Sequence, residues 1–196
     1  PQGKEAQVSV MSPDAVADVL AAHAAHPEIP LCAVCAGGAF VERGADDGFV
    51  AEMTMYSHNM RLVDSLAEQG PTTDVLMYWS RVDEGDLARA VALLDAATGP
   101  AVNVVDSGFG GGFGYLDVVQ PGVSKATGIR VLMDSFGIDA SEVMVFGDAG
   151  NDAEMLRLAG VGVAMGNASD ELKSIADLVC DPCEEQGVLK VLEEVF

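Results

Sequence analysis

The sequence has few basic residues and a single tryptophan. Ten lysines and arginines stand against 31 aspartates and glutamates, so the 196-residue chain has a formal net charge of −21. A field of this sign repels nucleic acid and anionic membrane surfaces, and we expect neither as a partner. It also repels phosphorylated molecules. A phosphate site in this chain would therefore have to be built locally from a cation, a lysine and backbone N–H groups.

Long apolar runs are also absent. No segment approaches the roughly 18 to 20 consecutive apolar residues that cross a bilayer, and the N-terminus lacks the basic and apolar regions of a signal peptide. Hydrophobic residues nevertheless make up 49% of the chain, which is enough to bury a substantial core. We therefore expect a globular cytoplasmic protein.

Cysteine and histidine are scarce. The three histidines have no metal-ligand spacing and are expected at the surface, while the four cysteines form two C-x-x-C pairs. Cys32 and Cys35 lie on a predicted strand, where residues three apart point to opposite faces and cannot share a metal. Cys180 and Cys183 precede a predicted helix, but the acidic residues around them disfavour a reactive thiolate. Both pairs are predicted to be structural, and a thiol protein that uses Cys180 and Cys183 is the weakest alternative.

The first part of the chain alternates between helical and strand-like patterns. Ser12 is a predicted N-cap, with Pro13 at the first helical position. The remaining elements follow from apolar periodicity and from Gly and Pro breaks. The predicted elements are a helix over 13–25, strands over 31–35, 39–42 and near 49–53, a helix around 62–66, a strand over 74–79, a helix over 83–96, a strand over 101–105, a glycine-rich hairpin through 108–114 and a strand over 115–119.

From Ser124 onward, short apolar strands alternate regularly with helices, which is typical of a parallel sheet covered on both faces. We place the domain boundary so that residues 1–119 form one domain and 120–196 another. Ligands of such sheets bind beyond the carboxyl ends of the strands. The predicted elements are helices over 124–136, 153–158, 169–175 and 184–194, and strands over 143–146, 161–164 and 178–180.

An acidic segment follows one of these strands. In Phe146-Gly147-Asp148-Ala149-Gly150-Asn151-Asp152, two carboxylates four residues apart and an amide can face the same crevice. Hard oxygen ligands of this kind suit Mg²⁺, which is usually held by one or two carboxylates, waters and phosphate oxygens. The same residues also fit an Asx-type turn that caps a helix, with Asp152 as the N-cap. The segment alone leaves both interpretations open.

Two further segments carry polar residues at the same predicted edge. Gln120-Pro121-Gly122-Val123-Ser124-Lys125 places a lysine at the start of a helix. Gly162-Val163-Ala164-Met165-Gly166-Asn167-Ala168 is a strand that ends in a glycine turn beside an amide. An isolated lysine is usually a solvated surface charge. Here its neighbours make it a candidate for the site.

Together the three segments resemble the Cof-type branch of the haloacid dehalogenase (HAD) superfamily of phosphatases. The family's lysine motif is matched by Gly122–Lys125, its acidic motif by Gly147–Asp152, and its following turn by Val163–Ala168, and residues 176–188 match its ending. The resemblance implies an α/β fold in which the C-terminal half of a Rossmann-like core, with a parallel sheet, is joined to an α/β cap domain. It also implies a hydrolase.

The resemblance implies roles for individual residues. Lys125 would steady the transferring phosphoryl group, Asp148 would ligate Mg²⁺, and Asp152 would ligate it directly or through water. Asn151 would hydrogen-bond the phosphoryl oxygens. The expected activity is Mg²⁺-dependent hydrolysis of a phosphomonoester, with a sugar phosphate or another small phosphorylated metabolite as substrate. Catalysis of this kind depends mostly on positioning and charge stabilisation.

The family's aspartate nucleophile lies in a D-x-D-G-T loop, and no such segment occurs in the sequence. We therefore expect an N-terminally truncated family member that is inactive by itself. A sheet without its central strand exposes apolar edges, so either a second copy of the chain or a further core segment is expected to cover them. The alternative function is a non-catalytic binding or regulatory protein that keeps the cap and part of the core.

Overall fold

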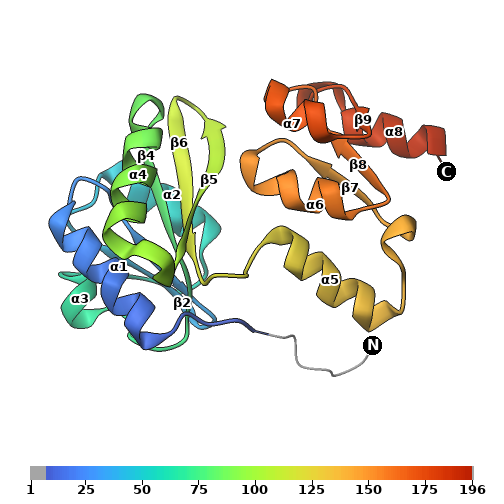
Figure 1. Ribbon diagram of the computed structural model, residues 1–196. Coiled ribbons are helices and arrows are strands. Elements are labelled where there is room, and N and C mark those ends of the chain that lie inside the picture. The colour runs from blue at the N-terminus through green and yellow to red at the C-terminus, as the bar shows by residue number, and fades with distance from the viewer. Residues whose placement is uncertain (1–7, 196) are drawn as a thin grey trace. The chain divides into compact units, whose positions relative to one another are not determined.

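Two units make up the computed structural model, which describes residues 8–195 (Figure 1). Sequence analysis places the boundary between residues 119 and 120, and the structure divides the chain between Pro121 and Gly122. Both units combine helices with sheets, which confirms the α/β class. None of the helices among the described residues has the length and apolar character needed to span a membrane.

Unit 1 is built on one six-stranded sheet with the strand order β3-β2-β1-β4-β6-β5. All of its strand pairs are antiparallel except β2 with β3. In chain order its elements are α1 (Pro13–Ala25), β1 (Cys32–Cys35), β2 (Gly38–Glu42), α2 (Asp47–Tyr56), β3 (Met60–Val63), α3 (Leu66–Gln69), β4 (Val75–Asp83), the 3₁₀ turn η1 (Glu84–Asp86), α4 (Leu87–Thr98), the 3₁₀ turn η2 (Gly99–Ala101), β5 (Asn103–Gly110) and β6 (Phe113–Val119).

Helices cover both faces of this sheet. On one face α1 and α4 bury Val19 and Leu94 against Tyr78 and Leu116 of the sheet. On the other face α2 packs Phe49 and Met53 against alternate residues of the central strands, including Cys32. Because side chains alternate along a strand, β4 contributes Tyr78 to the first core and its neighbour Trp79 to the second. The opposite faces of the sheet therefore have separate cores.

The strand predicted near residues 49–53 is wrong, because this segment lies in helix α2. Phe49, Ala51 and Met53 are apolar residues at every second position, a spacing that also fits a strand. In the structure the Asp46 side chain accepts a hydrogen bond from the Phe49 N–H and caps the helix. Phe49 and Met53 are then one turn apart on the buried face, while Ala51 is exposed.

The helix predicted around residues 62–66 is also wrong in part. Leu62 and Val63 end strand β3, which pairs in parallel with β2, and a short helix begins only at Leu66. The prediction relied on apolar residues at helical spacing, whereas the parallel pairing with β2 determines the structure of the segment. The predicted α1 helix is confirmed, with the Ser12 side chain accepting a hydrogen bond from the Ala15 N–H.

Unit 2 contains a parallel sheet of three strands in the order β7-β8-β9, as predicted. Helix α6 packs on β7 and β8 (Figure 1). Leu156 of this helix is buried in the core of the unit, together with Val145 of β7 and Ala164 of β8. Strand β7 is hydrogen-bonded to β8 along one edge. No strand in the described part of this unit pairs with its other edge. In chain order the elements are α5 (Lys125–Phe136), η3 (Ala140–Glu142), β7 (Met144–Gly147), η4 (Gly150–Asp152), α6 (Ala153–Leu158), β8 (Val161–Ala164), α7 (Asp170–Ile175), β9 (Leu178–Val179), η5 (Cys183–Glu185) and α8 (Gly187–Val195).

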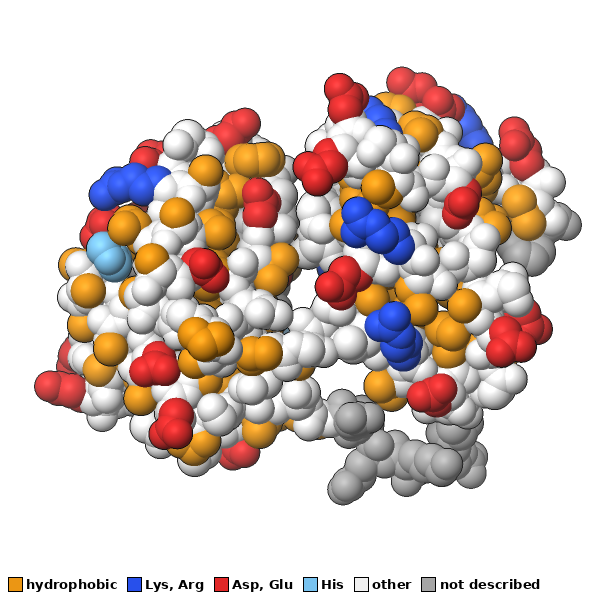
Figure 2. Space-filling view, in the orientation of Figure 1, with side chains coloured by type: hydrophobic (Ala, Val, Ile, Leu, Met, Phe, Trp, Pro, Cys, Tyr) orange, Lys and Arg blue, Asp and Glu red, His pale blue; other side chains and the backbone are white. Residues whose placement is uncertain are grey.

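Acidic side chains dominate the charged surface, in agreement with the net charge. In Figure 2, aspartates and glutamates are scattered over the visible face of each unit, and lysines and arginines are fewer. A binding site for an anion in this protein therefore depends on the few cations that the fold places precisely.

Candidate functional site

The acidic segment forms a closed loop at the carboxyl end of β7. The Asp152 side chain is only 3% exposed, and its Oδ2 accepts hydrogen bonds from the backbone N–H groups of Asp148 (2.9 Å) and Ala149 (3.1 Å). Asp152 makes no side-chain bond to the N-terminus of α6. Asp152 does occupy the N-cap position of α6, as that interpretation predicted, but its carboxylate bonds the start of η4 instead of the start of α6. The 3₁₀ turn η4 directs the carboxylate back into its own loop.

Lys125 approaches this loop from the first turn of α5. Ser124 and Thr127 form a capping box that begins the helix at Lys125. The Lys125 Nζ donates to Asp152 Oδ1 at 2.5 Å and to Asn151 Oδ1 at 3.1 Å. The lysine side chain is 49% exposed. A half-exposed ammonium is thus held over the acidic loop, where it can still meet a ligand from solvent.

Asn167 joins the cluster from the turn after β8. Its Nδ2 donates to Asp148 Oδ2 at 3.1 Å. The Gly162–Ala168 segment was predicted to lie at the ligand-binding edge, but no role was predicted for Asn167. The sequence feature that could have identified Asn167 is its position, because it is a polar amide just beyond a buried strand that is parallel to β7. The structure thus brings Lys125, Asp148, Asn151 and Asp152 together at one sheet edge and adds Asn167.

Gly147 leaves no room for a side chain behind this loop. A Cβ atom at this position would lie 2.5 Å from Asp152 Cβ and 2.7 Å from Leu156 Cδ1. Gly147→Ala is therefore expected to displace Asp152 and to lower the free energy of unfolding by about 1–3 kcal/mol, as overpacking does elsewhere. Thermal unfolding followed by far-UV circular dichroism measures the loss.

Gly128 provides the matched control for this substitution. It lies within α5, and a Cβ there meets nothing within 4 Å. Gly128→Ala should therefore stabilise the protein by up to about 1 kcal/mol through helix propensity. If the two alanine variants unfolded at the same temperature, the close contact behind the loop would be refuted.

The chain is similar to known proteins over nearly its whole length. The family model of haloacid dehalogenase-like hydrolases matches residues 1–192. The chain belongs to this family. The resemblance to the HAD superfamily is thereby confirmed.

Named relatives of this HAD-like hydrolase include phosphatases. The Escherichia coli K12 protein named 5-amino-6-(5-phospho-D-ribitylamino)uracil phosphatase YbjI is 32% identical over 196 residues, which is 100% of this chain and 70% of that protein. The crystal structure of SMU.1108c from Streptococcus mutans has a TM-score of 0.84 at 23% identity and covers 95% of this chain and 69% of that one. The HAD subclass IIB sugar phosphatase BT4131 has a TM-score of 0.76 at 25% identity, over 95% of this chain and 68% of that one.

The donor set of this HAD-like hydrolase fits a hard cation only in part. Asp148 is exposed, and one of its oxygens accepts from Asn167. Both oxygens of Asp152 already accept hydrogen bonds. In the described part of the chain, no three His, Cys, Asp or Glu residues gather where they could hold a metal ion. One exposed carboxylate still suits Mg²⁺, which commonly keeps several waters and takes one or two carboxylates.

The cysteines are divided between the units, with Cys32 and Cys35 in unit 1 and Cys180 and Cys183 in unit 2. All four are free thiols, with Cys32 buried on β1 and Cys183 exposed. Burial raises the pKa of the Cys32 thiol to about 12 and also raises the pKa of Cys180. A raised pKa keeps a thiol protonated at neutral pH and therefore makes it a poor nucleophile. The thiol-protein hypothesis gains no support from either group.

His23 corrects the prediction that the histidines lie at the surface. It is 8% exposed on the inner face of α1. Its Nδ1 lies 3.1 Å from the Ile29 carbonyl oxygen, and its Nε2 lies 3.3 Å from Glu42 Oε2. His23 follows Val16 and Val19 on the helix face that packs against the sheet, and this position buries it. Its role is structural.

Proposed function

We propose that unit 2 carries the lysine and metal-binding part of a Mg²⁺-dependent phosphomonoester hydrolase site, with unit 1 as its cap domain. The observation behind the proposal is the convergence of Lys125, Asn151 and Asp152, joined by hydrogen bonds, beside the exposed Asp148. Positive charge, amide groups and a carboxylate for a metal are what phosphoryl transfer requires. The phosphatase names of the relatives point the same way.

Each residue receives a role that its contacts allow. Asp148 would hold the cation directly, because its carboxylate is exposed. Asp152 would act on the cation through water, since its side chain is buried, with Oδ2 accepting from two loop N–H groups and Oδ1 from Lys125. When bound, Mg²⁺ neutralises charge on the phosphoryl oxygens. Lys125 stabilises the same oxygens as a point charge, and Asn151 positions the lysine and hydrogen-bonds the phosphoryl group.

The substrate class is a small phosphorylated metabolite. Sugar phosphates belong to this class, and so does the phosphoribityl aminouracil in the name of the Escherichia coli relative. The 196 residues contain no D-x-D-G-T segment, so the proposal assigns no nucleophile within this sequence. The competing function is a binding or regulatory protein that uses the same fold without turnover.

Metal binding tests this proposal without a nucleophile. Mn²⁺ titrated into the chain and followed by electron paramagnetic resonance should bind, and Mg²⁺ should displace it. Asp148→Ala should weaken binding by at least about tenfold, the lower end of the loss caused by changing groups around a metal site. Asp134→Ala, which removes an exposed aspartate on α5, is the matched control and should bind as the unaltered chain does. Equal binding by both variants would remove Asp148 from the site.

A further inference from the structure

A cavity lies entirely within unit 1, on the sheet face that α2 partly covers. It has a volume of about 480 Å³, which is in the range of small-molecule sites. Val34 and Met77 contribute apolar surface, and Tyr56, Trp79 and Tyr115 contribute aromatic surface. The polar lining includes the Glu52 carboxylate. The cavity thus combines flat apolar walls with a fixed hydrogen-bond acceptor.

Three aromatic side chains lie side by side along this face, Phe49 stacked with Trp79 and Tyr115 tilted against it. The Trp79 ring lies 5.7 Å from the Phe49 ring, at an interplanar angle of 22°, and 5.4 Å from the Tyr115 ring, at 33°. Phe49 is fully buried, whereas Trp79 and Tyr115 are partly exposed towards the cavity. Rings supported in this way offer a rigid surface on which another planar ring can stack.

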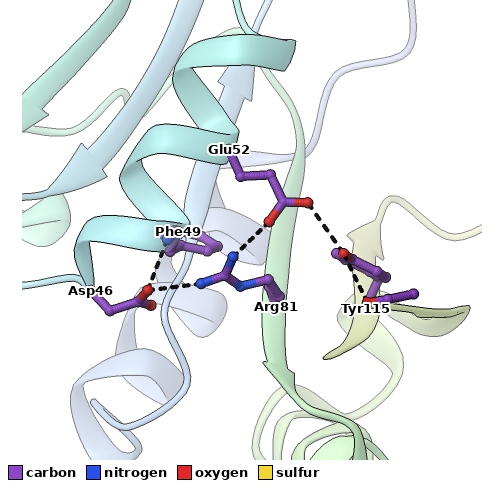
Figure 3. Close-up of polar contacts among 6 residues, drawn as sticks. Asp46, Phe49, Glu52, Arg81 and Tyr115 are labelled. Atoms are coloured by element: carbon purple, nitrogen blue, oxygen red, sulfur yellow. Dashed lines mark hydrogen bonds and ion pairs between the residues drawn. The ribbon is translucent and has the colours of Figure 1, made fainter. Parts of the chain in front are cut away.

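Glu52 is held at the cavity by two donors from different strands (Figure 3). Its Oε2 accepts from Arg81 Nη1 at 2.8 Å, and its Oε1 accepts from the Tyr115 hydroxyl at 3.2 Å. Burial, followed by the nearby Glu52 charge, raises the pKa of Tyr115, so the phenol stays protonated and donates. Each carboxylate oxygen has two acceptor sites, so Glu52 can accept further hydrogen bonds from a ligand.

Arg81 is committed to holding this carboxylate. Its side chain is 8% exposed, its Nη2 bonds Asp46 Oδ1 at 2.8 Å, and its guanidinium lies 4.1 Å from the centre of the Phe113 ring. One arginine between two carboxylates leaves a net negative charge beside the cavity. A phosphate group is disfavoured there, and a group that donates N–H bonds is favoured.

We propose that this cavity binds a planar nitrogen heterocycle of pyrimidine size, stacked on Trp79 and Tyr115, whose ring N–H groups donate to Glu52. Binding of the heterocycle does not depend on the proposed phosphatase function. The further idea that the cavity holds the non-phosphorylated end of a substrate rests on that proposed function.

The fluorescence of Trp79, the only tryptophan in the chain, tests the proposal directly. Uracil has two N–H donors, and 1,3-dimethyluracil has the same flat ring with none. Excitation at the red edge of tryptophan absorption avoids absorption by either ligand. Uracil should quench the emission in a saturable way. 1,3-Dimethyluracil should bind at least about tenfold more weakly, since bonds to a charged acceptor are the stronger kind.

Glu52→Gln should weaken uracil binding by about tenfold, because it removes the charge but keeps the shape. Glu68→Gln, at an exposed position of α3, is the matched control and should leave binding unchanged. Circular dichroism checks that each variant is folded. Absence of saturable quenching, equal affinity for the two ligands, or equal affinity in the two variants would overturn the proposal. The measurement uses neither metal nor phosphate ester, so failure of the phosphatase proposal would leave its result intact.

Discussion

The 196-residue chain is expected to show no phosphomonoester hydrolysis above background, and the same chain extended with a core segment that carries a D-x-D-G-T loop should be active with Mg²⁺. Phosphoryl transfer needs an attacking oxygen in line with the leaving group, and the charge of Lys125 and a metal cannot replace it. In the extended chain, Asp148→Ala and Lys125→Ala should each lower the rate by about 10²- to 10³-fold, the usual effect of losing one electrostatic contact of this type. Release of inorganic phosphate from a generic phosphomonoester, with and without Mg²⁺, measures both effects.

Two controls make this experiment decisive. Asp134→Ala in the extended chain should keep full activity, because this exposed residue lies outside the cluster. Metal-dependent turnover by the unextended chain, abolished by Asp148→Ala, would mean that these residues contain a nucleophile of another type. An extended chain that binds phosphate esters without hydrolysing them would favour the binding-protein alternative.

Phe49→Ala is expected to lower the free energy of unfolding of unit 1 by about 3–5 kcal/mol, the typical cost of removing a buried phenylalanine. Phe49 is fully buried between α2 and the sheet, where it packs with Met53, Val41 and Trp79. Urea unfolding followed by the fluorescence of Trp79 reports on this unit, since the two rings are stacked.

Phe109 is the matched control, because it is a phenylalanine of the same unit that is 59% exposed on β5. Phe109→Ala should change the free energy of unfolding by no more than about 0.5 kcal/mol, as is usual for surface positions. Similar losses in the two variants would contradict the packing of α2 on the sheet.

The elements with strong local signals were predictable from the sequence. Ser12 before Pro13 marked the start of α1, and Ser124 marked the start of α5, because capping depends on residues three or four positions apart. The segment at 49–53 was not predictable, since Phe49 and Met53 lie on the same side of a strand and also on the same side of a helix. The deciding contacts were the Asp46 cap and the packing of α2 on the sheet.

The candidate site was also predictable from the sequence only in part. The contact of Lys125 with Asn151 and Asp152 was expected from the resemblance of the motifs to the family. The arrangement of strand ends explains only the segments that follow β7 and β8, because α5 comes before the first strand of this sheet. The inward turn of Asp152 and the bond from Asn167 to Asp148 could not be predicted, since several loop conformations satisfy the same residues. Side-chain direction within the loop depends on the space that Gly147 leaves open.

By itself, the sequence determined the α/β class, the family and the edge of the sheet where the acidic loop lies, because these depend on periodicity and on motifs of adjacent residues. Only the tertiary structure decided which side chains meet across unit 1. Glu52 and Tyr115 are 63 residues apart and become partners because β4 and β6 are neighbours in the sheet and α2 covers that face. Strand order and register set such pairs, and both arise from packing over the whole unit.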